Sequence, residues 1–310
     1  MITTTLGRTG LEVSVAGLGG GGHSRLGTSY GKDFDHAVGV VRRALELGVN
    51  LIDTATNYQT EPHVGRAIAE VPRDSVVISS KCGVTINQQL LTGDEYVAKL
   101  ETSLKHLDTD YVDLYHLHGL KRAHYDHAVS EIVPALERAK QQGKLRHLAV
   151  SEEFISDPSH DMLKRALQDD FFDVVMVGHL LLNPSARRDV FPITQAKNIG
   201  TLGMFAVRRA LTRPEALREL LDQLVANSEI DPELLDIGSA NGPLGFLGDV
   251  VNAGYRFCAH EPGLDVVLFG TGNVEHLEMN LKSINEPPLP DEHLERLEKL
   301  FGHLNSVSGN

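Results

Sequence analysis

The sequence predicts an α/β protein, a closed (β/α)8 barrel of the TIM-barrel class with an N-terminal β-hairpin lid and an extra C-terminal helix. Short apolar runs alternate with longer amphipathic segments eight times along the chain, which is typical of parallel βαβ units. None of the short runs is heavily charged, and eight similar repeats favour a closed barrel over an open sheet. No low-complexity linker divides the 310 residues. We therefore expect one domain over residues 1–310.

The first expected element is a β-hairpin, in which Thr3–Leu6 and Glu12–Val15 flank a turn at residues 7–10. It would form a lid over one barrel end. Leu294, Leu297 and Leu300 recur at helical spacing near the end of the sequence, which predicts the extra helix. Residues rich in Gly, Asp and Pro predict an irregular insertion at 227–248. The eight expected strand and helix pairs are 15–18 and 34–47, 51–53 and 61–69, 76–80 and 94–106, 112–116 and 130–142, 147–150 and 158–167, 174–177 and 186–197, 201–205 and 214–226, and 266–269 and 274–283.

Composition and charge exclude several classes of function. A net charge of -13 disfavours nucleic acid as a partner, because the surface as a whole repels a phosphate backbone. Two cysteines are too few for a disulfide framework, which fits a reducing compartment. No apolar run approaches the roughly 20 residues of a membrane span. We expect a cytoplasmic protein that acts on a small molecule, and the oligomeric state stays open.

Polar side chains that can support catalysis stand near the ends of three consecutive expected strands. Asp53, Lys81 and His118 hold these positions, and Tyr58 follows Asp53 in the next loop. Active groups of (β/α)8 barrels lie at the C-terminal ends of the strands. We therefore expect the four side chains to converge on one cleft.

These residue types suit the reduction of a carbonyl. Hydride delivery to a carbonyl creates an alkoxide that must be protonated as it forms. Tyr58 can supply that proton, and a nearby ammonium such as Lys81 would lower the tyrosine pKa from its ordinary value of about 10. Asp53 would hold Lys81 charged and in place, and a neutral His118 imidazole could hydrogen-bond the carbonyl oxygen.

Beyond this chemistry, the sequence resembles the aldo-keto reductase family over almost its whole length, from LGRTGLEVSVAGLGGGG to GTGN. The segments NLIDTATNYQTEPHVGRAI, SSKCG and YVDLYHLHG resemble those that carry the family's catalytic Asp, Tyr, Lys and His. The resemblance implies that Tyr58 is the proton donor and acceptor, tuned by Lys81 and Asp53, while His118 orients the carbonyl. His118 matches the family position because it lies five residues beyond Asp113. His116, which shares its strand face, is then a packed neighbour.

The resemblance also implies a bound nicotinamide dinucleotide, NAD(P)(H), across the barrel mouth. The run at residues 19–22 lacks the GxGxxG spacing, so we interpret it as a tight loop beside the cofactor. In the family, the loops after the seventh and eighth strands hold the pyrophosphate and adenosine. The cofactor contacts implied here are Ser151, Glu152, Met176, Phe205, Arg209, Gly270, Thr271, Gly272, Asn273, His276 and Asn280.

Three positions depart from the family pattern around the nicotinamide. Glu152 replaces the usual Asn, Met176 replaces a Gln, and His179 stands where many members stack a Tyr. The phosphate-side loop GTGNVEH lacks the Lys or Arg of NADPH-preferring members and carries Glu275. This weakens the preference for NADP(H). Other cations could still reach a 2'-phosphate, so the phosphorylation state stays open: Arg208, Arg209 or Lys282.

Substrate contacts are expected from the loops after the first and fourth strands, at Tyr30, Arg122, His124 and Tyr125. Small polar aldehydes or sugars are the suggested substrates. Two alternatives stay open. The pair His116 and His118 could bind zinc in a metal-dependent hydrolase, although we expect no metal. The same fold could also serve a non-catalytic, nicotinamide-binding regulatory subunit.

Overall fold

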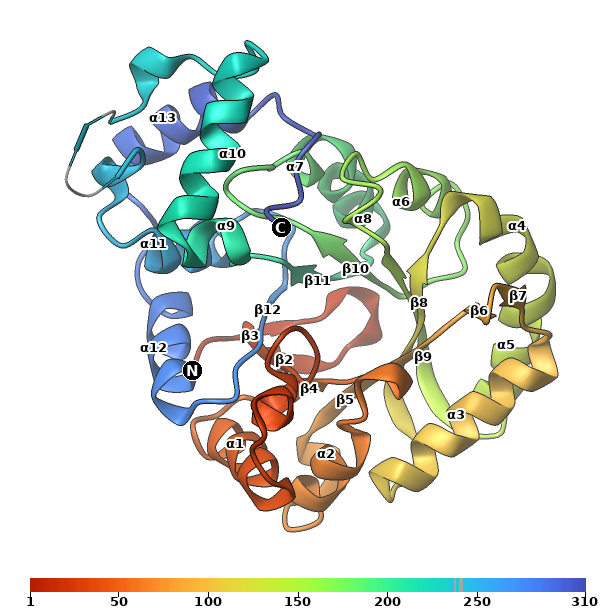
Figure 1. Ribbon diagram of the computed structural model, residues 1–310. Helices are drawn as coiled ribbons and strands as arrows, with labels where there is room; N and C mark the ends of the chain where they lie inside the picture. Colours follow the sequence, from red (N-terminus) through yellow and green to blue (C-terminus); the bar gives the residue numbers. More distant parts are fainter. Residues whose placement is uncertain (237, 240–241) are drawn as a thin grey trace.

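The computed structural model describes residues 1–236, 238–239 and 242–310. Eight parallel strands close into a barrel whose order around the ring follows the sequence (Figure 1). The predicted fold class is confirmed. The strands are β3 (Ala16–Gly19), β4 (Leu51–Asp53), β5 (Val77–Gly83), β8 (Val112–Leu120), β9 (Leu145–Glu152), β10 (Val174–Gly178), β11 (Gly200–Met204) and β12 (Val266–Phe269).

Helices surround the barrel in each of the eight repeats, as the amphipathic segments predicted. They bury apolar side chains against the strands, and most of these residues belong to one continuous core. The helices of these repeats are α1 (Phe34–Glu46), α2 (Glu61–Ile68), α3 (Gly93–Leu107), α5 (Val133–Gln141), α6 (Asp161–Ala166), α7 (Ala186–Asp189) with α8 (Phe191–Lys197), α10 (Pro214–Ala226) and α12 (Val274–Ile284). The extra C-terminal helix is α13 (Asp291–Phe301).

Two expected helices differ from the prediction. The segment 186–197 forms α7 and α8 instead of one helix, and the backbone departs from helical geometry at Val190. Pro192 explains the break, because a proline inside a helix lacks the N–H donor and clashes with the preceding turn. The segment 130–142 contains a π-helical turn at Ala128–Ile132 before α5 begins.

Several elements were not predicted. Helix α11 (Val250–Ala259) buries Tyr255 and Phe257, and the Asp249 side chain caps it by accepting from the N–H groups of Val251 and Asn252. The others are short: α4 (Tyr125–His127), α9 (Arg209–Thr212), and the hairpin of β6 (Thr85–Ile86) with β7 (Gln89–Leu90). The described part of the 227–248 insertion holds only 3-10 turns at Pro232–Leu234 and Gly245–Leu247, as expected for an irregular segment, while residues 237, 240 and 241 lie outside the description.

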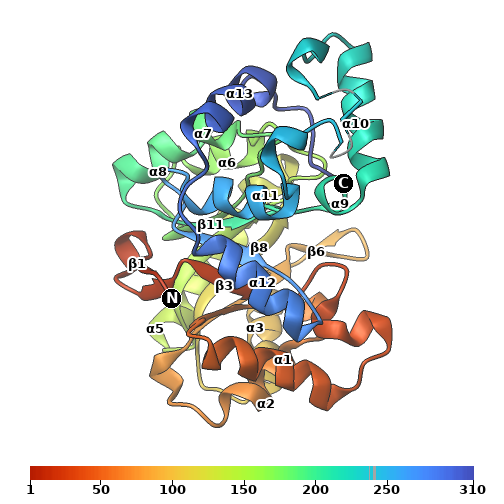
Figure 2. The same cartoon turned by 90° about the vertical axis from the view of Figure 1, so that its left-hand side faces the viewer.

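The N-terminal hairpin closes the end of the barrel where the strands begin. Strands β1 (Thr3–Thr5) and β2 (Glu12–Ser14) pair antiparallel. Leu6 and Val13 are buried and cluster with Leu51 and Val77, which lie at the starts of their strands. Figure 2 shows the hairpin on one side of the molecule and the C-terminal end of the chain on the other. The C-terminal ends of the barrel strands lie at the opposite end, which the hairpin leaves open.

Candidate functional site

The four predicted catalytic side chains come together at the C-terminal end of the barrel. Lys81 donates from Nζ to Asp53 Oδ1 and Oδ2, at 2.7 and 2.5 Å, and to the Thr54 carbonyl oxygen at 2.8 Å. The Tyr58 hydroxyl lies 3.3 Å from His118 Nε2. Lys81 Nζ is 4.9 Å from the centre of the Tyr58 ring. The cluster thus joins a buried ion pair to a tyrosine and a histidine.

Neighbouring strands and one short turn produce this geometry. Asp53 ends β4, Lys81 lies in β5, and His118 lies in β8 opposite Gly83. Tyr58 ends a 3-10 turn that begins at Thr56. Because the strands are parallel and adjacent, their ends bring residues far apart in sequence to one edge.

Burial and neighbouring charges together shift the pKa values of the cluster. It raises the pKa of Tyr58 above its ordinary value, while the charge of Lys81 acts in the opposite direction. The net shift is therefore opposite to the lowering expected from Lys81 alone. Burial also opposes the charge of Lys81, but Asp53 and Tyr58 together outweigh it, and the pKa of Lys81 is raised. Burial and then Lys81 lower the pKa of His118 to about 3.

His116 is a buried neighbour of the cluster. Its Nε2 lies 3.0 Å from Ser79 Oγ, and this hydroxyl donates to Asp53 Oδ1 at 2.8 Å. Burial lowers the pKa of His116 well below its ordinary value. Ser79, which the sequence did not single out, connects His116 to the Asp53 carboxylate. His116 thereby supports the residue that holds Lys81.

The glycine run after β3 makes room for the tyrosine. A Cβ atom on Gly21 would lie 2.4 Å from the Tyr58 ring, too close for any side chain. Gly20 donates its N–H to the Asp53 carbonyl oxygen at 2.6 Å. The run is therefore a tight loop against the catalytic cluster.

A cavity of about 1200 Å³ opens beside Asp53 and Tyr58. It is bounded by the loops after β3, β11 and β12 and by Met176 of β10. Most of the implied cofactor contacts line it, namely Met176, Phe205, Arg209, Gly270, Thr271, Gly272, Asn273 and His276. The implied contact Asn280 lies one turn beyond His276 on α12. Ser151 is buried, and its Oγ accepts a hydrogen bond from the Gly119 N–H at 2.8 Å.

The loop after β12 packs closely on the loop after β3. A Cβ atom on Gly272 would lie 2.2 Å from the Gly27 nitrogen, so only glycine allows this approach. His36 of α1 also contacts the Gly272 carbonyl oxygen, with its Nε2 at 2.7 Å. Residues 270–273 are thereby held at the cavity edge, where α12 begins.

Two positions around the expected nicotinamide pocket need correction. The Glu152 side chain accepts from the Gly178 N–H at 2.7 Å and contacts His160, which precedes α6, and it does not line the cavity. His179 is fully buried, with its ring centre 5.5 Å from that of Phe257, and does not reach the mouth. Phe205 is the aromatic residue that lines the cavity there. Its φ of 73° is unusual for a residue with a side chain.

The predicted substrate contacts separate in space. Tyr30 lines the cavity and is 69% exposed. Arg122 and His124 form a short 3-10 turn that is not part of the cavity lining. The expectation for Tyr125 is corrected, because this side chain is fully buried and its hydroxyl donates to Asp169 at 2.8 Å.

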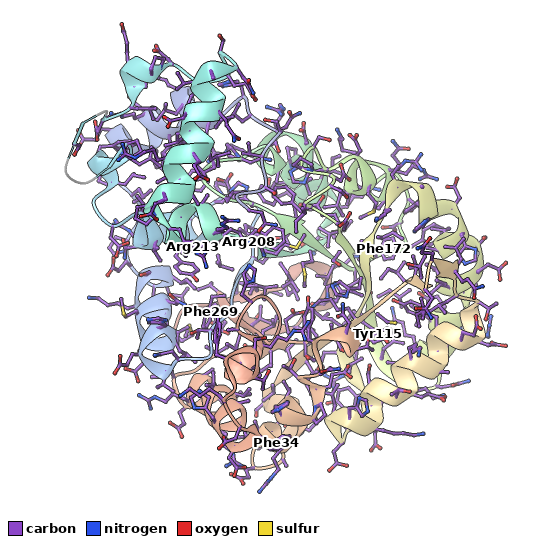
Figure 3. The ribbon with its side chains drawn as sticks, viewed as in Figure 1. Phe34, Tyr115, Phe172, Arg208, Arg213 and Phe269 are labelled. Atoms are coloured by element: carbon purple, nitrogen blue, oxygen red, sulfur yellow. The ribbon has the colours of Figure 1, made fainter. Side chains whose placement is uncertain are left out.

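Unpaired cations surround the cavity despite the acidic chain. Arg208, Arg209, Arg213 and Lys32 line it. Among the described residues, none of these four has a carboxylate within 4.0 Å. Figure 3 shows Arg208 and Arg213 close together near the base of α10, with Phe269 across the mouth. Such a set of cations without carboxylate partners fits an anionic group such as a phosphate.

The metal-hydrolase alternative finds little support in this geometry. Within residues 1–236, 238–239 and 242–310, no three His, Cys, Asp or Glu side chains gather in a way that could hold a metal ion. The positive charge of Lys81 also acts on both His116 and His118. A second cation beside this ammonium would be repelled.

Comparisons with known proteins point to one family. Residues 18–301 match the model of the aldo/keto reductase family. L-galactose dehydrogenase of Arabidopsis thaliana is 32% identical over 203 residues, covering 64% of this chain and 62% of that protein. The NADH-specific methylglyoxal reductase of Escherichia coli (strain K12) is 26% identical over 217 residues, covering 63% of this chain and 64% of that protein. The matched regions thus span less than two thirds of these two relatives.

The fold has a close structural counterpart. An aldo-keto reductase from Bacillus halodurans, solved in its holo form, superimposes with a TM-score of 0.77 at 24% identity, and the match covers 100% of both chains. Among the helices of the described residues, none has the length and apolar character needed to span a membrane.

Proposed function

The chain belongs to the aldo/keto reductase family, and we propose that it is an NAD(P)-dependent oxidoreductase that interconverts a carbonyl and an alcohol. One observation carries the proposal: a buried cluster of Tyr58, His118, Lys81 and Asp53 opens onto a cavity lined by cations that have no carboxylate partner among the described residues. The cluster can move a proton, and the cavity suits a phosphorylated cofactor.

The residues of the cavity fit a nicotinamide dinucleotide. Phe205 offers an aromatic face near the cluster, and Arg208, Arg209 and Arg213 offer donors for phosphate oxygens. Helix α12 begins at the cavity edge, where backbone N–H groups favour an anion. When bound, the cofactor supplies or accepts the hydride.

The side chains of the cluster handle the proton. The neutral His118 imidazole can donate one hydrogen bond to the carbonyl oxygen and so orient the substrate. The Tyr58 hydroxyl gives its proton to that oxygen as negative charge develops on it. Lys81, held by Asp53, then stabilises the tyrosinate that remains. In the direction of alcohol oxidation, the same tyrosinate accepts the proton.

We propose that NAD(H) is bound at least as well as NADP(H). Glu275 lies on the cavity lining at the start of α12, and a carboxylate there disfavours a 2'-phosphate. The NADH specificity of the E. coli relative agrees with this assignment. A preference for NADPH by about a hundredfold or more, which corresponds to roughly 2.7 kcal/mol, would contradict it.

Small polar aldehydes or sugars are the proposed substrates. The two relatives are named for L-galactose and methylglyoxal, both of them small and polar. The chain has no Trp, and Tyr30 is the exposed aromatic side chain at the cavity edge. Cys82 and Cys258 are both free and buried, which supports the proposal of a reducing, cytoplasmic environment.

Cofactor titration followed by a substrate panel tests the proposal. Binding of NAD(H) and NADP(H) is measured first, by quenching of protein or nicotinamide fluorescence. Methylglyoxal, simple aldehydes and aldoses are then supplied with NADH, and alcohols and sugars with NAD⁺. The proposal expects turnover in at least one direction. Tight cofactor binding without turnover on any member of the panel would favour the regulatory-subunit alternative.

A further inference from the structure

Glu152 is a buried carboxylate that the catalytic cluster does not use. It is 2% exposed, and it contacts no Lys or Arg side chain among the described residues. Its oxygens lie 3.0 Å from His160 Nδ1 and accept the Gly178 N–H. Burying a carboxylate costs free energy unless its hydrogen bonds compensate, so its position calls for an explanation.

A chain of buried hydrogen bonds leads away from Glu152. His160 Nε2 lies 3.0 Å from Ser185 Oγ, and this hydroxyl donates to Asn183 Oδ1 at 2.6 Å. Asn183 Nδ2 in turn donates to the Val307 carbonyl oxygen at 2.8 Å. His160, Asn183 and Ser185 are all fully buried. The chain therefore connects the end of β9 to residues 306–310, which we call the strap.

The strap lies against the loop that follows β11. The Ala210 N–H donates to the Gly309 carbonyl oxygen at 3.0 Å. Asn310 Oδ1 accepts from Arg208 Nε at 2.8 Å and also from Arg208 Nη2. Gly309 has a φ of 74° and packs near Leu180 and Arg208. In Figure 1 the C-terminal end of the chain lies beside α9, at the rim of the barrel. The strap thus holds one of the cavity cations.

Ring contacts make a second connection between the same regions. The Phe154 ring stacks on His160, with ring centres 5.4 Å apart, and lies 5.7 Å from Phe205. Gly178 makes room for this ring, because a Cβ atom there would lie 2.2 Å from it. The Arg208 guanidinium in turn lies 3.9 Å from the centre of the Phe205 ring. Both connections end at Arg208, and the second passes through Phe205.

We propose that Glu152 is a positioning residue for the cofactor site, which acts through His160, Ser185 and Asn183 on the strap and so fixes Arg208 at the cavity rim. The inference rests on the proposed function, because Arg208 is taken to contact a cofactor phosphate. An arginine side chain that is already held in place loses less entropy when it binds an anion. Glu152 therefore affects cofactor affinity more than the chemical step.

A double-mutant cycle tests the connection. Glu152→Gln keeps the size of the side chain and removes its charge, and a second variant lacks residues 306–310. Glu153→Gln is the matched control, because this neighbouring carboxylate contacts Ser156 and does not belong to the chain of hydrogen bonds. Ser185→Ala interrupts the same chain of hydrogen bonds at its middle. It replaces Glu152→Gln in the experiment if that variant does not fold.

Dissociation constants for NADH and NADPH are measured for each variant, together with kcat. Glu152→Gln and the strap deletion are each expected to weaken binding by about fivefold to tenfold, with kcat within about twofold. The double variant should bind no more weakly than the deletion alone, because both changes remove one connection. Additive losses, an unchanged affinity in Glu152→Gln and Ser185→Ala, or tighter binding without the strap would each overturn the proposal.

Hydrogen exchange at the Ala210 amide separates this proposal from the proposed function. The amide donates to the strap, so its exchange should speed up in Glu152→Gln and not in Glu153→Gln. Wild-type protein that binds neither NADH nor NADPH would contradict the proposed function, while the exchange result would still show whether Glu152 holds the strap. Unchanged exchange in Glu152→Gln and Ser185→Ala would refute the connection itself.

Discussion

Two protonation states at single residues determine how the site depends on pH. Tyr58 must carry its proton to act as the acid, and burial raises its pKa above the ordinary value. His118 must be neutral to orient a carbonyl, and its pKa is lowered to about 3. The tyrosine therefore stays protonated until the pH rises through its elevated pKa, and the histidine becomes charged only when the pH falls to about 3.

This predicts a one-sided pH profile for carbonyl reduction. We expect kcat to stay nearly flat from about pH 5 to pH 9, between the two shifted pKa values, and to fall only in more alkaline solution. The profile is measured with cofactor and carbonyl both saturating. A fall in kcat below about pH 6.5, the ordinary pKa of histidine, would instead show that His118 becomes charged in the working site at that pH.

Lys81 should matter for stability as well as for activity. Lys81→Met leaves Asp53 buried without its ion-pair partner, which is expected to cost about 3–5 kcal/mol in the free energy of unfolding. Adding Asp53→Asn removes the orphaned charge and should restore much of that loss, although turnover stays low in both variants. Urea denaturation measures the difference. If Lys81→Met is as stable as the wild type, the ion pair does not have the assigned role.

At the residue scale, the sequence revealed the catalytic cluster but not all of its surroundings. Asp53, Lys81 and His118 could be found because they stand at the ends of recognisable strands. The prediction that Glu152 and His179 lie beside the nicotinamide was wrong, because the face to which a strand-end side chain points depends on the strand's exact register. Phe205 was predicted as a contact, but the sequence did not indicate that its ring replaces the expected His179 at the mouth.

At the scale of elements, the N-terminal hairpin stabilises the barrel from the end opposite the site. Leu6 is fully buried at that end and clusters with Val13 and Leu51. Leu6→Ala should therefore destabilise the protein by about 2–5 kcal/mol through the cavity that it leaves. It should leave kcat unchanged, because the catalytic groups lie at the other end.

Urea denaturation and steady-state kinetics on the same sample check this prediction. Ile2→Ala is the matched control, since Ile2 is 50% exposed and its loss should change stability by less than about 0.5 kcal/mol. A large loss of kcat in folded Leu6→Ala protein would show that the hairpin influences the site.

Helix and strand positions were predicted well where periodicity was long, and poorly where a local interaction decided the outcome. Segment 214–226 is a helix with the expected bounds, because its apolar side chains repeat over several turns. Helix α11 was missed although Asp249 provides a capping signal, because its sequence lies beside an irregular insertion. The break between α7 and α8 follows from Pro192, a residue whose effect could have been read directly from the sequence.

At the scale of the whole molecule, the net charge and the charge of the cavity have opposite signs. The chain carries a net charge of -13, yet Lys32, Arg208 and Arg213 line the same cavity. Composition could not reveal the positive charge of the cavity, because Lys32 lies far from the two arginines in sequence. The closed barrel brings all three residues to the same cavity lining. The fold class itself could be predicted, since eight repeats of one strand and helix pattern have few other arrangements.

A single domain predicts a single unfolding transition over residues 1–310. Fluorescence and circular dichroism should report the same midpoint in urea, because closing the barrel requires all eight strands. NADH at a hundredfold excess over its Kd should stabilise the whole protein by about 2.7 kcal/mol. Two separated transitions, only one of them sensitive to NADH, would contradict the single domain.

The proposed reaction depends on proton donation by Tyr58, and single-turnover oxidation of enzyme-bound NADH measures this step. Wild type and Tyr58→Phe are each loaded with NADH and mixed with the best carbonyl of the panel, and the nicotinamide absorbance is followed. We expect an unchanged Kd for NADH and a rate lower by about a hundredfold or more in Tyr58→Phe, because the proton donor is missing. Equal single-turnover rates in the two proteins would contradict it.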